Sequence, residues 1–127
     1  MEATARIRVL LVDDHVMVRQ GLRAAIQAYP NIEVVGEADD GDSGVVRAAE
    51  LQPAVVIMDI AMPKMDGITA TRLIKTQHPQ IVVLGLSVDP KDFQVSAMRR
   101  AGAFDVLKKE QGINDLYESI QRAVAVV

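Results

Sequence analysis

The chain has 127 residues, of which 50% are hydrophobic and 24% are charged, as is typical of a single soluble globular domain. A formal net charge of −3 argues against a protein that coats nucleic acid, and the small number of aromatic residues argues against a base-stacking surface. The lack of cysteine excludes disulfides and thiolate metal sites. Apolar runs such as Ala54–Met58 are much shorter than the ~18 residues of a membrane-spanning helix, and no signal peptide precedes Asp13. We therefore expect a cytoplasmic domain that binds neither nucleic acid nor membranes.

Short β-branched runs alternate with segments of helical period along the chain. The first predicted strand, Ile7–Val12, precedes an apolar stripe from Val18 to Tyr29 that is spaced as one face of a helix, and Pro30 ends that helix. The later predicted strands are Ile32–Glu37, Ala54–Met58, Ile81–Leu86 and Asp105–Lys108, and the later predicted helices are Ser43–Leu51, Gly67–Thr76, Lys91–Arg100 and a C-terminal helix after Gly112. Five strands that each precede a helix predict a parallel α/β sheet covered on both faces. No linker interrupts residues 1–127, so we expect one domain.

Polar residues follow four of the five predicted strands. Ligands of an open parallel sheet bind beyond the carboxyl ends of its strands, so these positions are candidates for a site. They are Asp13 and Asp14 after the first strand, Asp59 after the third, Ser87 after the fourth and Lys109 after the fifth. Glu37 ends the second strand and is expected at the sheet edge, outside this group.

Each of these residues also has an ordinary structural explanation. Asp14 could cap the first helix, Ser87 could be a turn residue, and Lys109 could be a solvated surface charge. Asp59 fits such an explanation least well, because an acid directly after a buried strand is costly without a partner. The convergence of all five positions, rather than any one of them, favours a functional site.

Three carboxylates at one edge of a sheet need a compensating charge. At about 4 Å and an effective dielectric near 20, each like-charged pair costs on the order of 4 kcal/mol. Lys109 reduces the summed charge of Asp13, Asp14 and Asp59 from −3 to −2, which one divalent cation neutralises. Oxygen ligands without histidine or cysteine favour Mg²⁺, Mn²⁺ or Ca²⁺ over zinc. A carboxylate beside Mg²⁺ can act as the nucleophile in phosphoryl transfer.

Four segments of the chain carry motifs that can be compared with known families. These are Leu11–Asp14, Met58–Gly67, Leu86–Ser87, and Ala101–Ala103 followed by Lys109. Together they resemble the CheY-like receiver domain of bacterial response regulators, and the resemblance covers about residues 7–124. It implies a flavodoxin-like (βα)5 three-layer sandwich with strand order 2-1-3-4-5. The run from Asp14 to Leu22 is similar to receivers of LuxR/NarL-type regulators, and hybrid sensor kinases carry similar domains.

The resemblance also implies a role for each candidate residue. Asp59 is the expected phosphoacceptor, Ser87 binds the phosphoryl group and Lys109 pairs with it. Mg²⁺, or Mn²⁺ in its place, is expected on Asp14, Asp59 and the backbone carbonyl of Ala61, with Asp13 assisting through water. The phosphoryl donor is a histidine kinase or a phosphotransfer protein. Such a receiver phosphorylates itself and loses the group slowly, so it is not a conventional enzyme.

Phosphorylation of such a receiver switches the surface formed by the predicted helix 91–100, strand 105–108 and the C-terminal helix. Two departures from the family pattern fall near this surface, because Val106 occupies the usual position of a switch aromatic and Glu110 that of a proline. They leave a second hypothesis open, that of an interaction module that works without phosphorylation. A phosphatase or a flavin protein is disfavoured, since Ala61 replaces the second acid of the former and the Asp13–Asp14 pair repels the phosphate of the latter.

The biological setting of the domain has several alternatives. The chain could be the receiver of a LuxR-type transcription factor, the receiver of a hybrid kinase, or a free-standing regulator, and we expect no output domain within residues 1–127. Homodimerisation through the switch surface, or through the first and last helices, is also open. The sequence does not choose among these.

Overall fold

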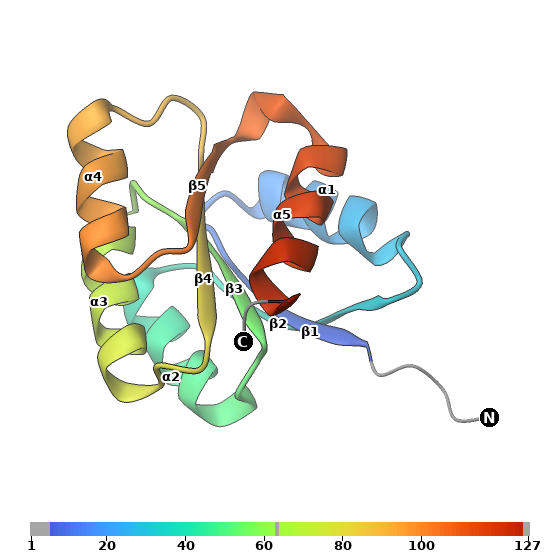
Figure 1. Ribbon diagram of the computed structural model, residues 1–127, viewed down its shortest axis with the longest axis horizontal. Helices are drawn as coiled ribbons and strands as arrows, with labels where there is room; N and C mark the ends of the chain where they lie inside the picture. The colour runs from blue at the N-terminus through green and yellow to red at the C-terminus, as the bar shows by residue number, and fades with distance from the viewer. Residues whose placement is uncertain (1–5, 63, 126–127) are drawn as a thin grey trace.

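The computed structural model describes residues 6–62 and 64–125, so Pro63 of the Met58–Gly67 motif lies outside the described residues. Strands alternate with helices throughout this part of the chain (Figure 1). The elements are β1 (Ile7–Val12), α1 (Val16–Gln27), β2 (Ile32–Ala38), α2 (Gly41–Leu51), β3 (Val55–Asp59), α3 (Gly67–Gln77), β4 (Val82–Ser87), α4 (Asp92–Ala101), β5 (Asp105–Lys108), a 3-10 turn (Lys109–Gln111) and α5 (Ile113–Ala125).

The strands form one parallel sheet in the order β2-β1-β3-β4-β5, which confirms the predicted flavodoxin-like fold. The boundaries of β3 and β4 lie one residue further along the chain than predicted. The reason is that Asp59 pairs with Leu86 and Ser87 pairs with Lys108 within the ladders. Two prospective site residues are therefore part of the sheet itself and share its rigidity.

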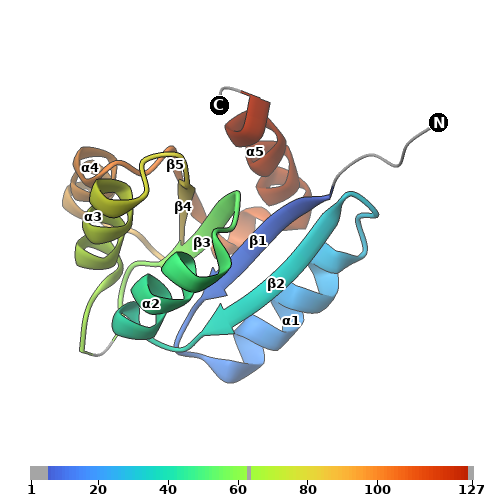
Figure 2. The same ribbon diagram turned by 90° about the horizontal axis from the view of Figure 1, so that it is seen from below.

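Two apolar cores cover the two faces of the sheet. Along β1, Val9 and Leu11 pack into the core beneath α1 and α5, whereas Leu10 and Val12 pack into the core beneath the other three helices. This alternation is the period of two that a strand imposes on its side chains. Figure 2 shows the resulting layers, with α1 and α5 on one side and α2, α3 and α4 on the other. All four residues are at most 1% exposed.

Helix α1 ends earlier than the apolar stripe suggests. Tyr29 lies beyond the last helical residue, and its ring stacks on Tyr117 of α5 with 3.7 Å between ring centroids. The hydroxyl of Tyr29 donates to Asn114, and that of Tyr117 donates to Asn31. The apolar spacing at Tyr29 therefore reflects packing between α1 and α5 rather than another turn of helix.

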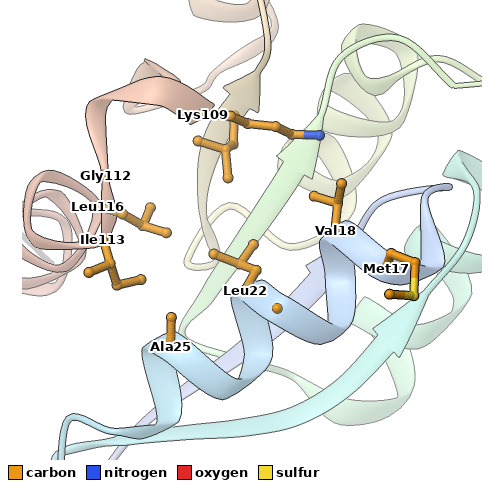
Figure 3. A pocket seen from close by; sticks show the side chains of 10 residues that line it. Met17, Val18, Leu22, Ala25, Lys109, Gly112, Ile113 and Leu116 are labelled. Carbon is orange, nitrogen blue, oxygen red and sulfur yellow. The ribbon is translucent and has the colours of Figure 1, made fainter.

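An apolar groove lies between α1 and α5 (Figure 3). Its cavity volume is about 260 Å³, and its walls include Met17 and Leu22 of α1 and Ile113 of α5. Leu86 and Lys109 also line it, so the groove reaches the strand end that carries Ser87. The groove is next to the acidic residues without containing them.

Ser119 of α5 is fully buried, and its hydroxyl has no hydrogen-bond partner within the described part of the chain. A buried polar group without a partner is destabilising, and alanine is also the better helix former. We therefore expect Ser119→Ala to raise the free energy of unfolding by about 1 kcal/mol. Urea denaturation followed by circular dichroism measures this change. A less stable Ser119→Ala would show that the Ser119 hydroxyl makes a stabilising hydrogen bond.

Candidate functional site

The carboxyl ends of four strands place the predicted polar residues at one edge of the sheet. Asp13 and Asp14 follow β1 directly, Asp59 is the last residue of β3, and Ser87 is the last residue of β4. Lys109 begins the 3-10 turn that follows β5. Asp13, Asp59 and Ser87 are 3%, 5% and 8% exposed. Such burial is unusual for the two carboxylates and calls for compensating partners.

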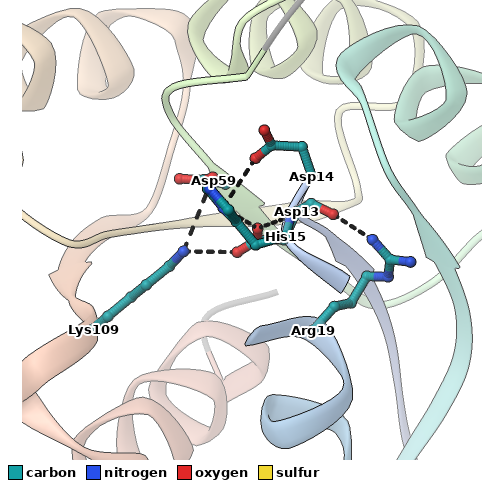
Figure 4. Close-up of polar contacts among 6 residues, drawn as sticks. All are labelled: Asp13, Asp14, His15, Arg19, Asp59 and Lys109. Carbon is teal, nitrogen blue, oxygen red and sulfur yellow. Dashed lines mark hydrogen bonds and ion pairs between the residues drawn. The ribbon is translucent and has the colours of Figure 1, made fainter. Parts of the chain in front are cut away.

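Lys109 provides the nearest positive charge to these carboxylates (Figure 4). Its Nζ donates a hydrogen bond of 2.7 Å to Asp13 Oδ2 and lies 3.9 Å from Asp59 Oδ2. The lysine side chain is only 15% exposed. The neighbouring Lys108, in contrast, is exposed at the end of β5. Lys109 is thus held by Asp13 while it remains close to Asp59.

The turn between β1 and α1 leaves Asp14 free to act in the cluster. The helix begins with His15 as its N-cap, and His15 makes no side-chain cap hydrogen bond, so capping by Asp14 is not observed. Asp14 Oδ1 is buried and accepts no hydrogen bond from the described residues, although His15 Nδ1 lies 3.2 Å away. A buried carboxylate oxygen that accepts no hydrogen bond and lies beside two other carboxylates fits a bound cation.

One ligand atom from each of Asp13, Asp14, His15 and Asp59 lies within 4.8 Å of the others. This spacing is compatible with a divalent cation held mainly by oxygen atoms. The sequence did not assign His15 a role, because a single exposed histidine carries little information. Its side chain is indeed 61% exposed, yet its Nδ1 lies 3.2 Å from Asp13 Oδ1. The only feature of the sequence that pointed to a role for His15 was its position directly after the acidic pair.

Asp59 also lines a pocket of about 290 Å³, most of whose lining residues are polar. Ala61, Ser87 and Lys109 line this pocket, so the predicted phosphoryl-binding residues share one cavity with the predicted phosphoacceptor. His15 also lines the pocket, and the loop after β4 and the first turn of α4 supply the rest of the wall through Val88, Asp89, Lys91 and Gln94. The sequence reasoning missed these four, since they are exposed or half-buried residues of a loop and a helix start.

The environment of Asp59 raises its pKa from 3.8 to about 6. Burial is the largest cause, because it disfavours the charged form, and the nearby charges of Asp13 and Asp14 act in the same direction. The charge of Lys109 opposes them and lowers the pKa. Asp59 is therefore mostly ionised at pH 7 but is more basic than an ordinary aspartate.

Glu37 does not join the acidic cluster, as expected from its place at the sheet edge. It instead pairs with two arginines of α1, since Arg19 Nε lies 2.7 Å from its Oε1 and Arg23 contacts its Oε2. Arg19 also reaches Asp13, where its Nη1 donates to the backbone carbonyl at 2.6 Å. This connection between β2 and the acidic pair could not be read from the sequence.

The fold and the site together define a class of protein. A parallel sheet of order 2-1-3-4-5, with a buried aspartate, an acidic pair and a lysine at its carboxyl edge, is the arrangement of a receiver domain. Residues 9–121 match the family model of the response regulator receiver domain, and the chain therefore belongs to this family of two-component signalling proteins.

Relatives and solved structures agree with this assignment. The chain is 46% identical to the transcriptional regulatory protein LiaR of Bacillus subtilis over 92% of its own length, and 38% identical to the response regulator GacA of Pseudomonas protegens over 94%. It spans 56% of each of these relatives. The signal receiver domain of NarL from Mycobacterium tuberculosis superposes with a TM-score of 0.91 at 26% identity, covering 96% of this chain and 98% of that one. The response regulator domain of Thermotoga maritima CheB gives 0.89 at 35% identity, with the same coverage.

Across residues 6–62 and 64–125, none of the helices combines the length and the apolar character that crossing a membrane would require.

Proposed function

We propose that this chain is a phosphoaccepting receiver, in which Asp59 takes a phosphoryl group from the phosphohistidine of a histidine kinase or phosphotransfer protein. The observation that carries this proposal is the arrangement around Asp59. A buried carboxylate of raised pKa lies 3.9 Å from Lys109 Nζ, beside the acidic pair and in the wall of a pocket lined mostly by polar residues. No conventional turnover of an external substrate is proposed.

The reaction follows from these groups. An Oδ atom of ionised Asp59 attacks phosphorus, the P–N bond to the donor imidazole breaks, and the nitrogen leaves with the bonding electron pair. Lys109 is placed to pair with a phosphoryl oxygen, and the Ser87 hydroxyl, in the same pocket, to donate to another. Mg²⁺ (or Mn²⁺) on Asp14, Asp59 and the Ala61 carbonyl, with Asp13 assisting through water, would neutralise charge on the transferred group.

Phosphorylation adds a charge of about −1.5 to −2 and new acceptor oxygens at the end of β3. Ser87 and the loop after β4 would move toward that charge. Helix α4 would respond because it follows this loop directly, and β5 and α5 because both contact β4. Asp105 of β5 links both helices, as its carboxylate lies 3.1 Å from Arg99 and 3.8 Å from Arg122. Val106 has no aromatic ring, so we propose a switch based on these polar contacts and on loop movement.

Incubation with acetyl phosphate and Mg²⁺ tests the central step. We expect intact mass spectrometry to show one added phosphoryl group on the wild type and none on Asp59→Asn, because the amide cannot attack phosphorus. Ser87→Ala serves as a control that removes a binding group but keeps the nucleophile, and it should be modified slowly. A phosphoryl group that persists in Asp59→Asn would refute the assignment.

The alternative, an interaction module independent of phosphorylation, is distinguished by beryllofluoride, which mimics the phosphoryl group. With Mg²⁺ present, amide resonances around Ser87 and Val106 should shift if the pocket and the α4-β5-α5 face are coupled. Unchanged resonances at both positions would favour the alternative. This second experiment is motivated by Val106 and Glu110, the two residues that depart from the family pattern.

We further propose that the receiver controls a transcriptional output, as the name of its relative LiaR indicates for that protein. The receiver itself would contact no DNA, in keeping with its net charge of −3. A histidine kinase partner in the cytoplasm is part of this proposal, and homodimerisation stays a prediction.

A further inference from the structure

We propose that Arg19 is a positioning residue that fixes the acidic pair, Asp13 and Asp14, for cation binding by anchoring the backbone between them to β2. This inference rests on the proposed function, because it concerns the same site. Arg19 touches none of the groups expected to react, and it acts through the backbone of Asp13 alone.

Arg19 is held on both sides. Its Nη1 donates to the Asp13 carbonyl at 2.6 Å, while its Nε donates to Glu37 Oε1 at 2.7 Å. The Arg19 side chain is only 14% exposed. Hydrogen bonds from a planar guanidinium to two fixed acceptors have a defined geometry that a flexible ammonium cannot reproduce. Arg19 therefore bridges Glu37 of β2 and the turn that carries the acidic pair, and Figure 4 shows its contact with Asp13.

The bridge completes the restraints on Asp13. The Asp13 amide donates to the Ala38 carbonyl of β2 at 3.0 Å, and its side chain is held by Lys109 and by the His15 amide. The carbonyl contact with Arg19 fixes the remaining part, the peptide group that joins Asp13 to Asp14. The orientation of this peptide sets the direction in which the Asp14 side chain leaves the backbone.

Glu37 keeps Arg19 in place. It lies on β2 with a side chain that is 22% exposed. Burial alone raises the pKa of Glu37, but the hydrogen bonds and charges of Arg23 and Arg19 lower it on balance, so Glu37 is ionised at neutral pH. Arg23 shares Glu37 with Arg19, but among the described residues it makes no hydrogen bond or ion pair with Asp13. A substitution of Arg23 is therefore a matched control for a substitution of Arg19.

Positioning and simple electrostatics predict opposite effects on cation affinity. Arg19 is a positive charge near three carboxylates, so its removal should strengthen Mg²⁺ binding if charge alone matters. If Arg19 positions the acidic pair, its removal should weaken Mg²⁺ binding despite the more negative site. Groups of this kind around a metal typically change affinity by 10–100-fold when they are removed.

The experiment compares Arg19→Met with Arg23→Met in the otherwise intact chain, with Mg²⁺ affinity measured by calorimetry. We expect about a tenfold loss for Arg19→Met and an unchanged or slightly higher affinity for Arg23→Met. The Asp14 amide resonance, whose nitrogen belongs to the contacted peptide, should shift in the first variant only. Arg19→Lys keeps the positive charge but lacks the planar guanidinium that donates to two acceptors. Its Mg²⁺ affinity should therefore lie between those of Arg19→Met and the wild type.

The outcomes separate this inference from the proposed function. Equal Mg²⁺ affinities for the two methionine variants, or tighter binding by Arg19→Met, would overturn the positioning role while leaving the receiver function intact. If the wild type neither binds Mg²⁺ nor accepts a phosphoryl group, the proposed function itself fails. Urea denaturation of both variants shows whether a loss of affinity reflects unfolding, since each removes one partner of Glu37.

Discussion

Replacement of Gly67 by alanine is expected to destabilise the protein by about 3 kcal/mol and to slow phosphorylation of Asp59. Gly67 begins α3, and a Cβ built there would lie 2.1 Å from the Asp59 carbonyl oxygen and 2.9 Å from Ile60 Cα. These neighbours are backbone atoms of a buried strand end, so they cannot turn aside as a side chain could. The N-terminus of α3 and the end of β3 would have to separate.

The same close approach connects stability with the site. The Gly67 amide donates to the Ile60 carbonyl at 2.8 Å, and Asp66 caps α3 by accepting from the Thr69 amide. The loop that contains Ala61 is therefore closed against the strand that carries Asp59. Any separation should move Asp59 relative to Lys109, and we expect the rate of modification by acetyl phosphate to fall together with stability.

Gly21→Ala provides the matched control for this substitution. A Cβ at Gly21 meets no atom within 4 Å, and the position lies inside α1. Alanine favours the helix over glycine by about 1 kcal/mol, so this variant should become more stable. Urea denaturation of both variants is the measurement. Equal midpoints for Gly67→Ala and the wild type would show that the packing at the end of β3 is looser than the structure indicates.

The fold and the convergence of the site were accessible from the sequence for a simple geometric reason. Parallel strands bring their carboxyl ends to one edge, so residues such as Asp59 and Ser87 must meet once the strands are located. Short apolar, β-branched runs located those strands to within a residue or two, because strands such as Val55–Met58 are covered on both faces and carry few polar side chains. The strand order itself came from the family resemblance.

The contacts within the site were harder to predict from the sequence, because they depend on the directions in which the side chains point. The sequence indicated Lys109 as a partner of a phosphoryl group, but its direct hydrogen bond goes to Asp13. Arg19 lies on a helix, and its link to Asp13 depends on the angle at which α1 leaves the sheet. Neither the spacing of residues nor their type determines such an angle.

The raised pKa of Asp59 leads to the second large effect, on stability. A carboxyl whose pKa is 3.8 in the unfolded chain and about 6 in the folded one binds protons more strongly when folded. The free energy of unfolding should therefore fall as the pH rises from about 4 to about 6, and the full cost of burying the charge is present above pH 6. Below pH 3.8 this cost disappears.

Asp59→Asn removes that cost, because an amide of the same shape does not ionise. We expect the variant to exceed the wild type by about 2 kcal/mol at pH 7.5 in the presence of EDTA, and to match it near pH 4. Urea denaturation at the two pH values measures the difference. Asp89→Asn is the control of opposite sign, since the hydrogen bond and charge of Lys91 lower the pKa of that exposed carboxyl.

Addition of Mg²⁺ separates a stability effect of the cluster from a general effect of the amide. A cation that binds the folded wild type stabilises it by an amount that grows with the logarithm of the cation concentration above Kd, whereas the variant, which lacks one carboxylate, should gain less. The difference between the two proteins at pH 7.5 should therefore shrink as Mg²⁺ rises. If the wild type is already as stable as Asp59→Asn in EDTA, burial of the Asp59 charge at the end of β3 costs no stability. The physical basis for a cation at this site would then be lost.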